Sequence, residues 1–323
     1  IVFVQAAIAT SDLGLPDDWQ FMLVQALAVA GRVAGLRARV PSPAALPATP
    51  APTEARQGDE KLAVRLEGVR FTYQGRDEPT LDGLTLHVPA GQSLAIVGEN
   101  GAGKTTLIKL LCGMYEPAAG GVEVAGVSPL EARGRVGVIF QDFVRYPLAL
   151  RENVGFGHLP LIGDRQALEG ALRDAGGAEL AARLPGGWDT VLSREYEGGA
   201  DLSGGQWQRV ALARALAAVR GGAGILILDE PTASLDVRAE TELFERFLEL
   251  AKGVTTILVS HRLSSVRRAD RIVVIGDGRV MEDGTHDELM RLGGRYATMY
   301  SLQAERFAAR AAGGADEEEV ADA

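Results

Sequence analysis

The fold of this chain is decided by a run of nine residues, GENGAGKTT, made up of Gly98, Glu99, Asn100, Gly101, Ala102, Gly103, Lys104, Thr105 and Thr106. An apolar run at 93–97 precedes it and is typical of a strand buried on both faces of a parallel sheet. Residues with helical periodicity follow it. Glycines between a strand and a helix let successive backbone N–H groups converge on one anion, toward which the helix also points the positive end of its dipole. The run therefore predicts a phosphate-binding loop in an α/β fold, and we call residues 98–106 the cradle.

Two side chains of the cradle suit a metal-bound nucleotide triphosphate. The Lys104 ammonium offers a point charge to the β and γ phosphates, and the Thr105 hydroxyl can ligate Mg²⁺. The alternative is a chance glycine-rich turn before a helix. The buried strand before the cradle and the helix after it favour the phosphate-binding interpretation.

A second apolar run, at 224–228, ends in the two acids Asp229 and Glu230. A metal-bound triphosphate needs a further carboxylate ligand and a group that positions the attacking water. Asp229, at the strand tip, is predicted to hold Mg²⁺ through its water shell. Glu230 is predicted to be the general base. For either acid the alternative is a solvated strand end or a cap of the next helix.

A second glycine-rich motif, LSGGQ, consists of Leu202, Ser203, Gly204, Gly205 and Gln206. Serine is a favoured N-cap residue, and the sequence from Gln206 to Leu216 predicts a helix. Its exposed N–H groups and dipole would make a second anion site, this time without a lysine. The alternative is a capped helix whose glycines allow close packing.

The motif order within residues 61–303 resembles that of the nucleotide-binding domain of ABC (ATP-binding cassette) proteins. After the cradle come Gln141, LSGGQ, Asp229-Glu230, Ser234-Leu235-Asp236 and His261. The resemblance implies the α/β P-loop NTPase fold of the ABC type. This fold has a mixed central sheet, an antiparallel edge sheet and a helical subdomain, expected here at about 149–215. ATP and Mg²⁺ are the implied cofactors, and ATP hydrolysis is the implied activity.

The resemblance also implies roles for residues that spacing alone leaves open. Tyr73 resembles the aromatic that stacks on adenine, although its alternating strand also suits a core position. Gln141 resembles the residue that touches Mg²⁺ and senses the membrane domain. His261 resembles the histidine that contacts the γ-phosphate and the attacking water, and Asp236 lies in the loop that crosses the dimer seam. In the family, LSGGQ of one copy meets the γ-phosphate held by a second copy, which gives two ATP sites per symmetric dimer.

Composition limits the classes of partner. The net charge of −10 over 323 residues argues against a sequence-independent nucleic-acid binder. The single cysteine, Cys112, excludes an internal disulfide and suits a reducing compartment. The expected location is the cytoplasmic face of the cell membrane.

Three segments outside the cassette carry further predictions. Residues 1–40 resemble the helical cytoplasmic end of the membrane domain that precedes the nucleotide-binding domain in exporter-type ABC proteins, with an unrelated helical arm as the alternative. The uncharged stretch within them, 19–31, is shorter than a bilayer span. Residues 41–60 are rich in proline and predict a linker, and residues 304–323 predict an acidic tail.

The leading interpretation is the ATPase domain of an exporter, with a second nucleotide-binding domain and a transmembrane domain as partners. Arg151-Glu152-Asn153-Val154 and Glu197 resemble exporter domains, whereas Trp207 replaces the arginine common at its position. The alternatives are a separate ATPase subunit of an importer and a soluble ABC ATPase acting on DNA or ribosomes. A cassette that binds ATP without hydrolysing it is disfavoured, because Lys104, Asp229, Glu230 and His261 are all present.

Overall fold

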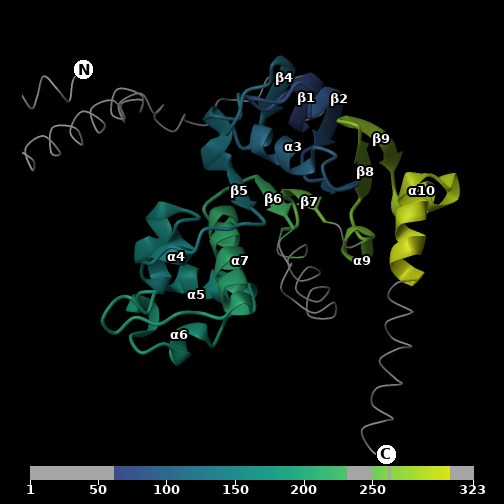
Figure 1. The fold of residues 1–323 in the computed structure, drawn as a ribbon. Helices are drawn as coiled ribbons and strands as arrows, with labels where there is room; N and C mark the ends of the chain where they lie inside the picture. Colours follow the sequence, from purple (N-terminus) through teal and green to yellow (C-terminus); the bar gives the residue numbers. More distant parts are fainter. Residues whose placement is uncertain (1–61, 231–248, 250, 261–262, 306–323) are drawn as a thin grey trace, which may run out of the picture. The chain divides into compact units, whose positions relative to one another are not determined.

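The computed structural model describes residues 62–230, 249, 251–260 and 263–305 (Figure 1). The predictions for residues 1–40 and 41–60, and for most of the acidic tail, fall outside these ranges. So do Asp236 and His261.

A six-stranded sheet forms the centre of the described part and has the order β5-β6-β7-β3-β8-β9. Its strands are β5 (Val136–Ile139), β6 (Ile225–Asp229), β7 (Thr255–Val259), β3 (Ser93–Val97), β8 (Arg271–Gly276) and β9 (Arg279–Gly284). The first five are parallel, and β9 pairs antiparallel with β8. The sheet is therefore mixed, as the sequence predicts.

Both faces of the central sheet are covered. In β3, Leu94 and Ile96 belong to one hydrophobic cluster, while Ala95 and Val97 belong to the other. Strands β6, β7 and β8 alternate in the same way. This two-sided burial explains why these strands appear in the sequence as continuous apolar runs.

A separate three-stranded antiparallel sheet, with the order β2-β1-β4, lies over one face. It consists of β1 (Leu62–Phe71), β2 (Leu81–Pro89) and β4 (Ala119–Val124). Helix α3 (Lys104–Leu111) buries its apolar side chains in the same cluster as β1, β2 and one face of the central sheet. The predicted antiparallel sheet is present, with β4 as a strand that the sequence pattern did not reveal.

Helices cover the other face. They are α4 (Leu150–Gly155), α5 (Arg165–Asp174), α6 (Leu180–Arg183) and α7 (Gly204–Arg220), with short 3₁₀ segments at Leu159–Gly163 and Gly187–Asp189. Helix α7 packs against α4, α5 and β5. Another 3₁₀ segment, Glu131–Arg135, precedes β5.

The last described elements, in chain order, are α9 (Leu263–Val266), the β8–β9 hairpin, α10 (His286–Leu292) and helical residues at 295–305. Asp277 and Gly278 connect the hairpin strands with φ values of 50° and 70°. Positive φ at both central residues is the mark of a tight hairpin turn. None of the helices in the described ranges has the length and apolar character needed to cross a membrane.

Candidate functional site

The topology brings most of the predicted site to one edge of the central sheet. Strand β3 leads into the cradle, β6 ends at Asp229, and Gln141 follows the end of β5. These strands are parallel, so their carboxyl ends share one edge, where ligands of open α/β sheets bind. In the sequence His261 comes two residues after Val259, the last residue of β7, and it lies outside the described residues.

Two glycines of the cradle are required by close backbone contacts. Gly98 has φ +151°, and a Cβ there would lie 2.2 Å from the Ile275 carbonyl oxygen. Gly103 has φ +102°, and its Cβ would lie 2.7 Å from a Leu81 methyl group. Any side chain at either position would displace the loop from β8 or β2, and so the cradle depends on these glycines.

Lys104 lies inside the cradle. Its Nζ donates hydrogen bonds of 2.8 Å to the carbonyls of Gly98 and Glu99, and the residue is 7% exposed. Burial lowers the pKa of the ammonium, while the charges of Glu230 and Asp229 raise it. In the described part of the chain no side chain caps the start of α3, and its first turn holds no acid. The helix thus presents N–H groups and a positive dipole beside a buried cation, as an anion site requires.

Asp229 is the most unusual carboxylate of the described part. The residue is 1% exposed, and neither carboxylate oxygen makes a hydrogen bond of ordinary length and angle with a described residue, although the Thr105 hydroxyl is near enough to lower the pKa of the carboxyl. Burial, and then the charge of Glu230, raise its pKa to about 6, with Thr105 and Lys104 acting in the opposite direction. Buried polar atoms are rarely left unpartnered, so these oxygens indicate a ligand position.

The donor set at this edge fits Mg²⁺. A carboxylate and a hydroxyl, from Asp229 and Thr105, are oxygen ligands of the kind that this ion prefers. The described residues contain no group of three or more His, Cys, Asp or Glu side chains able to hold a metal. A cation here would therefore depend on oxygens from a bound phosphate and water, which is how Mg²⁺ usually binds beside nucleotides.

Glu230 has a strained backbone. Its φ is +48°, in the left-handed region that non-glycine residues seldom adopt, and its N–H donates to the Val259 carbonyl at 2.9 Å. Strain of this kind costs about 1–3 kcal/mol and clusters at active sites. The hydrogen bond to β7 fixes the turn that carries this half-buried residue away from the end of β6.

Tyr73 is half-buried and tied to the cradle, because its hydroxyl and the Thr106 hydroxyl form a 3.1 Å hydrogen bond. Its ring meets Phe71 edge-to-face at 4.9 Å between centroids and Tyr115 at 5.5 Å. Sequence reasoning missed Tyr115, which is 42% exposed and follows α3. No motif marks Tyr115, and only the fold brings it beside Tyr73.

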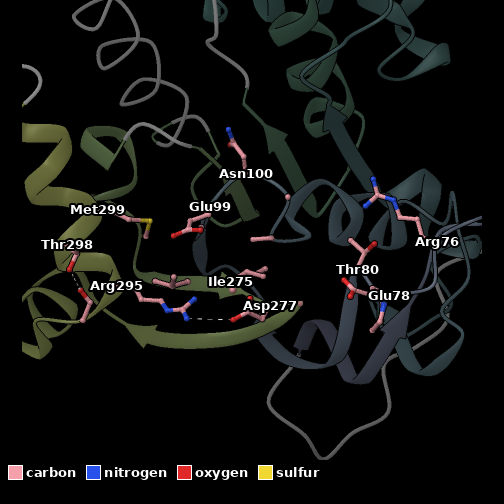
Figure 2. Close-up of a pocket in the computed structure, with 18 of the residues that line it drawn as sticks. Arg76, Glu78, Thr80, Glu99, Asn100, Ile275, Asp277, Arg295, Thr298 and Met299 are labelled. Atoms are coloured by element: carbon pink, nitrogen blue, oxygen red, sulfur yellow. Dashed lines mark hydrogen bonds and ion pairs between the residues drawn. The ribbon is translucent and has the colours of Figure 1, made fainter.

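An open groove of about 970 Å³ lies in front of the cradle (Figure 2). Residues 98–102 line one part of it, and residues 76–80 and the β8–β9 turn line others. Arg295 and Asp277 form an ion pair at 3.7 Å on its border. No residue of LSGGQ lines this groove.

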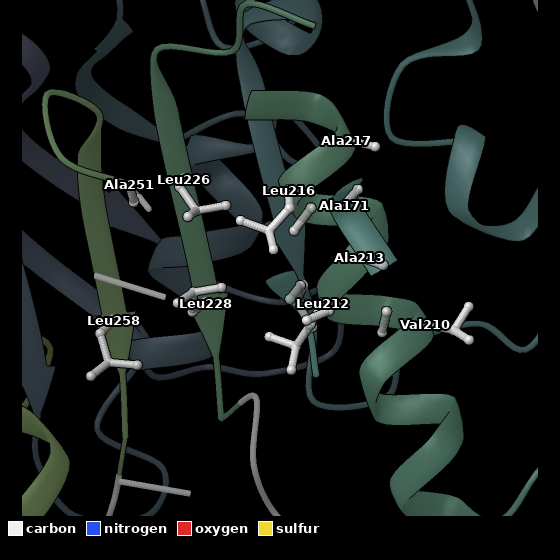
Figure 3. Packing of buried hydrophobic residues seen from close by; sticks show 14 of the residues in the cluster. Ala171, Val210, Leu212, Ala213, Leu216, Ala217, Leu226, Leu228, Ala251 and Leu258 are labelled. Atoms are coloured by element: carbon white, nitrogen blue, oxygen red, sulfur yellow. The ribbon is translucent and has the colours of Figure 1, made fainter. Parts of the chain in front are cut away.

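LSGGQ lies instead at the start of α7, whose apolar face packs onto β5 and β6 (Figure 3). Ser203 Oγ accepts from the Gln206 N–H at 3.4 Å, and Gln206 Oε1 accepts from the Ser203 N–H at 2.8 Å. This reciprocal pair is a capping box. Ser203 and Gly204 are exposed. The structure therefore gathers Lys104, Thr105, Asp229 and Glu230 at one edge and leaves LSGGQ on a different surface.

Gln141 is exposed, and its neighbours Phe140 and Asp142 line an apolar groove of about 330 Å³ between β5, the loop at 142–146 and α7. Arg214 of α7 donates to the carbonyls of Val144 and Asn153, and its guanidinium lies 4.9 Å from the Tyr146 ring centroid. Buried Asn153 in turn donates to the carbonyls of Tyr146, Leu148 and Ala149. Sequence reasoning missed Arg214, which joins the loop after Gln141 to the helix that begins with LSGGQ.

A glycine-rich phosphate loop between strand and helix, followed by an acid at the tip of a nearby parallel strand, defines the P-loop class of nucleoside triphosphatases. Residues 81–233 match the family model described as "ABC transporter". The chain belongs to this family, whose matched part holds the cradle and Asp229. This confirms the predicted family, fold class and nucleotide.

Individual proteins agree with this assignment. The chain is 40% identical over 247 residues to the ATP-dependent lipid A-core flippase of Chromohalobacter salexigens, covering 74% of this chain and 41% of that protein. It is 36% identical over 249 residues to the subtilin transport ATP-binding protein SpaT of Bacillus subtilis, covering 74% and 40%. A solved structure of a bacterial Atm1-family ABC exporter with ATP bound matches with a TM-score of 0.73 and 34% identity, covering 88% of this chain and 49% of that one. The chain thus spans about two fifths of the length of these curated relatives.

Proposed function

We propose that this chain hydrolyses Mg²⁺-bound ATP and thereby drives transport by a larger membrane exporter. The observation that carries the proposal is the buried Asp229 carboxylate, which makes no hydrogen bond of ordinary length and angle with a described residue and lies beside the Thr105 hydroxyl and the Lys104 ammonium. A structural carboxylate would be paired or solvated. The Asp229 carboxylate is instead suited to be a ligand of Mg²⁺ bound together with ATP.

The residues would divide the work as follows. Lys104 and the N–H groups of 98–106 bind the phosphates, and Tyr73 stacks on the adenine, supported by Tyr115. Thr105, Asp229 and Gln141 would hold Mg²⁺, which when bound neutralises charge that develops on the phosphate oxygens.

Glu230 accepts a proton from the attacking water as the water oxygen bonds to the γ-phosphorus. The bond from that phosphorus to the β–γ bridging oxygen breaks, and ADP and inorganic phosphate leave. His261 is proposed to orient the same water. The strained backbone of Glu230 supports its role, since functional sites are where such strain persists.

Two copies would complete each other's sites. The exposed capped start of α7 would present Ser203, Gly204, Gly205 and Gln206 to the γ-phosphate bound by a second copy, because none of them lines the groove beside the cradle of its own chain. The contact is isologous, so a dimer has two ATP sites.

The transmembrane partner and the domain limits belong to this proposal. The relatives are more than twice as long as their matched parts, which supports a membrane domain in the complete exporter. We place the nucleotide-binding domain at 61–303, preceded by the end of the membrane domain at 1–40 and the linker at 41–60. The apolar groove beside Gln141 is the surface for the membrane domain at the cytoplasmic face.

The test replaces Glu230 by glutamine and compares ATP turnover, ATP binding and dimerisation on a sizing column. Turnover should fall by about 10²-fold or more, while ATP still binds and now holds a dimer. Glu169→Gln is the matched control, because Glu169 is an exposed partner of Arg165 on α5 and surface pairs contribute little. Turnover equal to that of the control would remove Glu230 from the role of base.

A further inference from the structure

Trp207 follows LSGGQ directly, and the proposed function gives it no task. It is 2% exposed in the first turns of α7. Its indole Nε1 donates a hydrogen bond of 3.2 Å to Asp201 Oδ1. Because Asp201 precedes LSGGQ and Trp207 follows it, this bond spans the whole motif.

The same carboxylate oxygen also accepts a hydrogen bond from the motif backbone. The Leu202 N–H donates to Asp201 Oδ1 at 2.8 Å. The bonds from Trp207 and Leu202 hold the pKa of Asp201 below its usual value, with the Trp207 bond as the largest cause. An ionised Asp201 therefore links the indole to the backbone just before Ser203.

A second link is apolar. Leu202 and Trp207 occupy the positions on either side of the Ser203 N-cap that form a hydrophobic staple, which fixes the angle at which a chain enters its helix. Both side chains are buried in the same hydrophobic cluster. Ser203 between them is exposed, so it is the part of the turn that a ligand can reach.

An arginine at position 207 could also donate to the Asp201 carboxylate, but it would not supply the large apolar ring that packs with Leu202 in the staple. Tryptophan combines a large apolar ring with a single N–H donor. The tryptophan that replaces the common arginine at position 207 therefore has a specific partner in this chain, the Asp201 carboxylate.

We propose that Trp207 and Asp201 form a positioning pair that fixes Ser203 and the following N–H groups in the orientation that contacts a γ-phosphate held by a second copy. This inference rests on the proposed function. The pair touches no substrate and acts through the motif backbone.

The test uses the 323-residue chain and measures kcat and KM for Mg²⁺-ATP, together with the melting temperature. Trp207→Phe keeps a buried ring and removes the N–H, and Asp201→Ala removes the acceptor from an exposed position. Each should lower kcat by about threefold to tenfold, as expected for one lost hydrogen bond, while KM stays within about twofold. The double variant should be no worse than the single ones, and Asp201→Asn, which keeps Oδ1, should restore most of the rate.

The outcomes separate this inference from the proposed function. If Ser203→Ala lowers kcat while Trp207→Phe and Asp201→Ala do not, the positioning pair is wrong and the proposed function stands. If the losses in kcat multiply in the double variant, the two residues act independently and do not form a positioning pair. If kcat follows the melting temperature in every variant, Asp201→Asn included, the two residues contribute only to packing. If Ser203→Ala leaves kcat unchanged, the proposed function fails first.

Discussion

Helices α3 and α7 both start at glycine-rich turns, but their first turns are satisfied in opposite ways. Helix α3 starts after Gly103 without a side-chain cap in the described chain, and buried Lys104 folds back on the loop. Helix α7 starts at Ser203, whose capping box with Gln206 satisfies backbone groups on both sides. The first N–H groups of α3 have no side-chain acceptor in the described chain, whereas the start of α7 is capped by its own Ser203 and Gln206 side chains.

The difference predicts different affinities. An uncapped helix start with a buried ammonium gains donors and charge complementarity when a phosphate binds. A capped start already satisfies part of its first turn through the Gln206 N–H to Ser203 bond at 3.4 Å, so it has fewer N–H groups and no ammonium to offer an anion. We expect the cradle to set ATP affinity in the single chain and α7 to act only in the closed dimer.

The largest expected effect is the loss of ATP binding when a glycine at the start of α3, but not of α7, is replaced by alanine. Gly103→Ala should abolish measurable ATP binding, because φ is +102° and the new methyl would meet Leu81 and the Thr80 carbonyl within 3 Å. Gly204→Ala is the matched control, since a Cβ there has no described atom within 4 Å. Calorimetric titration with Mg²⁺-ATP should show unchanged binding for Gly204→Ala, and equal losses in both variants would contradict the comparison.

The next largest expected effect is on ATP affinity when Lys104 of α3, rather than Ser203 of α7, is replaced by alanine. Lys104→Ala should weaken ATP binding by about 10- to 100-fold, the value of a hydrogen bond to a charged group. Ser203→Ala should leave the affinity of the single chain unchanged and lower hydrolysis. Exposed Lys252→Ala serves as the control for loss of a positive charge. Weaker ATP binding by monomeric Ser203→Ala would refute the division of labour between the two helices.

A stability effect should follow from Asp229. Because burial raises the folded pKa of Asp229 from the ordinary value of 3.8 to about 6, its contribution to stability falls as the pH rises through this interval. Asp229→Asn should therefore raise the melting temperature of the nucleotide-free chain by several degrees at pH 8 and by about half as much at pH 5, where the unfolded Asp229 is already ionised and the folded one is not. Scanning calorimetry at both pH values measures this, with exposed Asp142→Asn as the control. An equal shift at both pH values would show that the gain in melting temperature does not come from ionisation of Asp229.

The smallest effect concerns the adenine. Tyr115→Ala removes a ring that holds Tyr73 edge-to-face, and such pairs contribute about 0.5–1.5 kcal/mol. ATP should bind about twofold to tenfold more weakly, while inorganic triphosphate, which lacks the base, should bind as before. A matching loss for triphosphate would move the role of Tyr115 from the adenine to the cradle.

The sequence predicted what local chemistry determines. Glycines at 98 and 103, a strand before them and a helix after them suffice to specify the cradle, and the apolar run before Asp229 specifies its edge. Strand β4 was missed because its sequence, AGGVEV, is weak in apolar character and mostly exposed. Tyr115, Arg214 and the Asp201–Trp207 bond were missed for another reason. Each depends on a tertiary contact or a rotamer that no spacing rule encodes. The roles of His261 and Asp236 stay predictions.

The left-handed backbone at Glu230 has an evolutionary consequence. Glycine and asparagine adopt φ near +50° more easily than glutamate does, so each would relieve strain at this point of the fold. Only selection for turnover opposes that gain in stability. In diverged paralogues whose task is to bind ATP without cleaving it, this position should drift toward those two residues before the cradle itself decays.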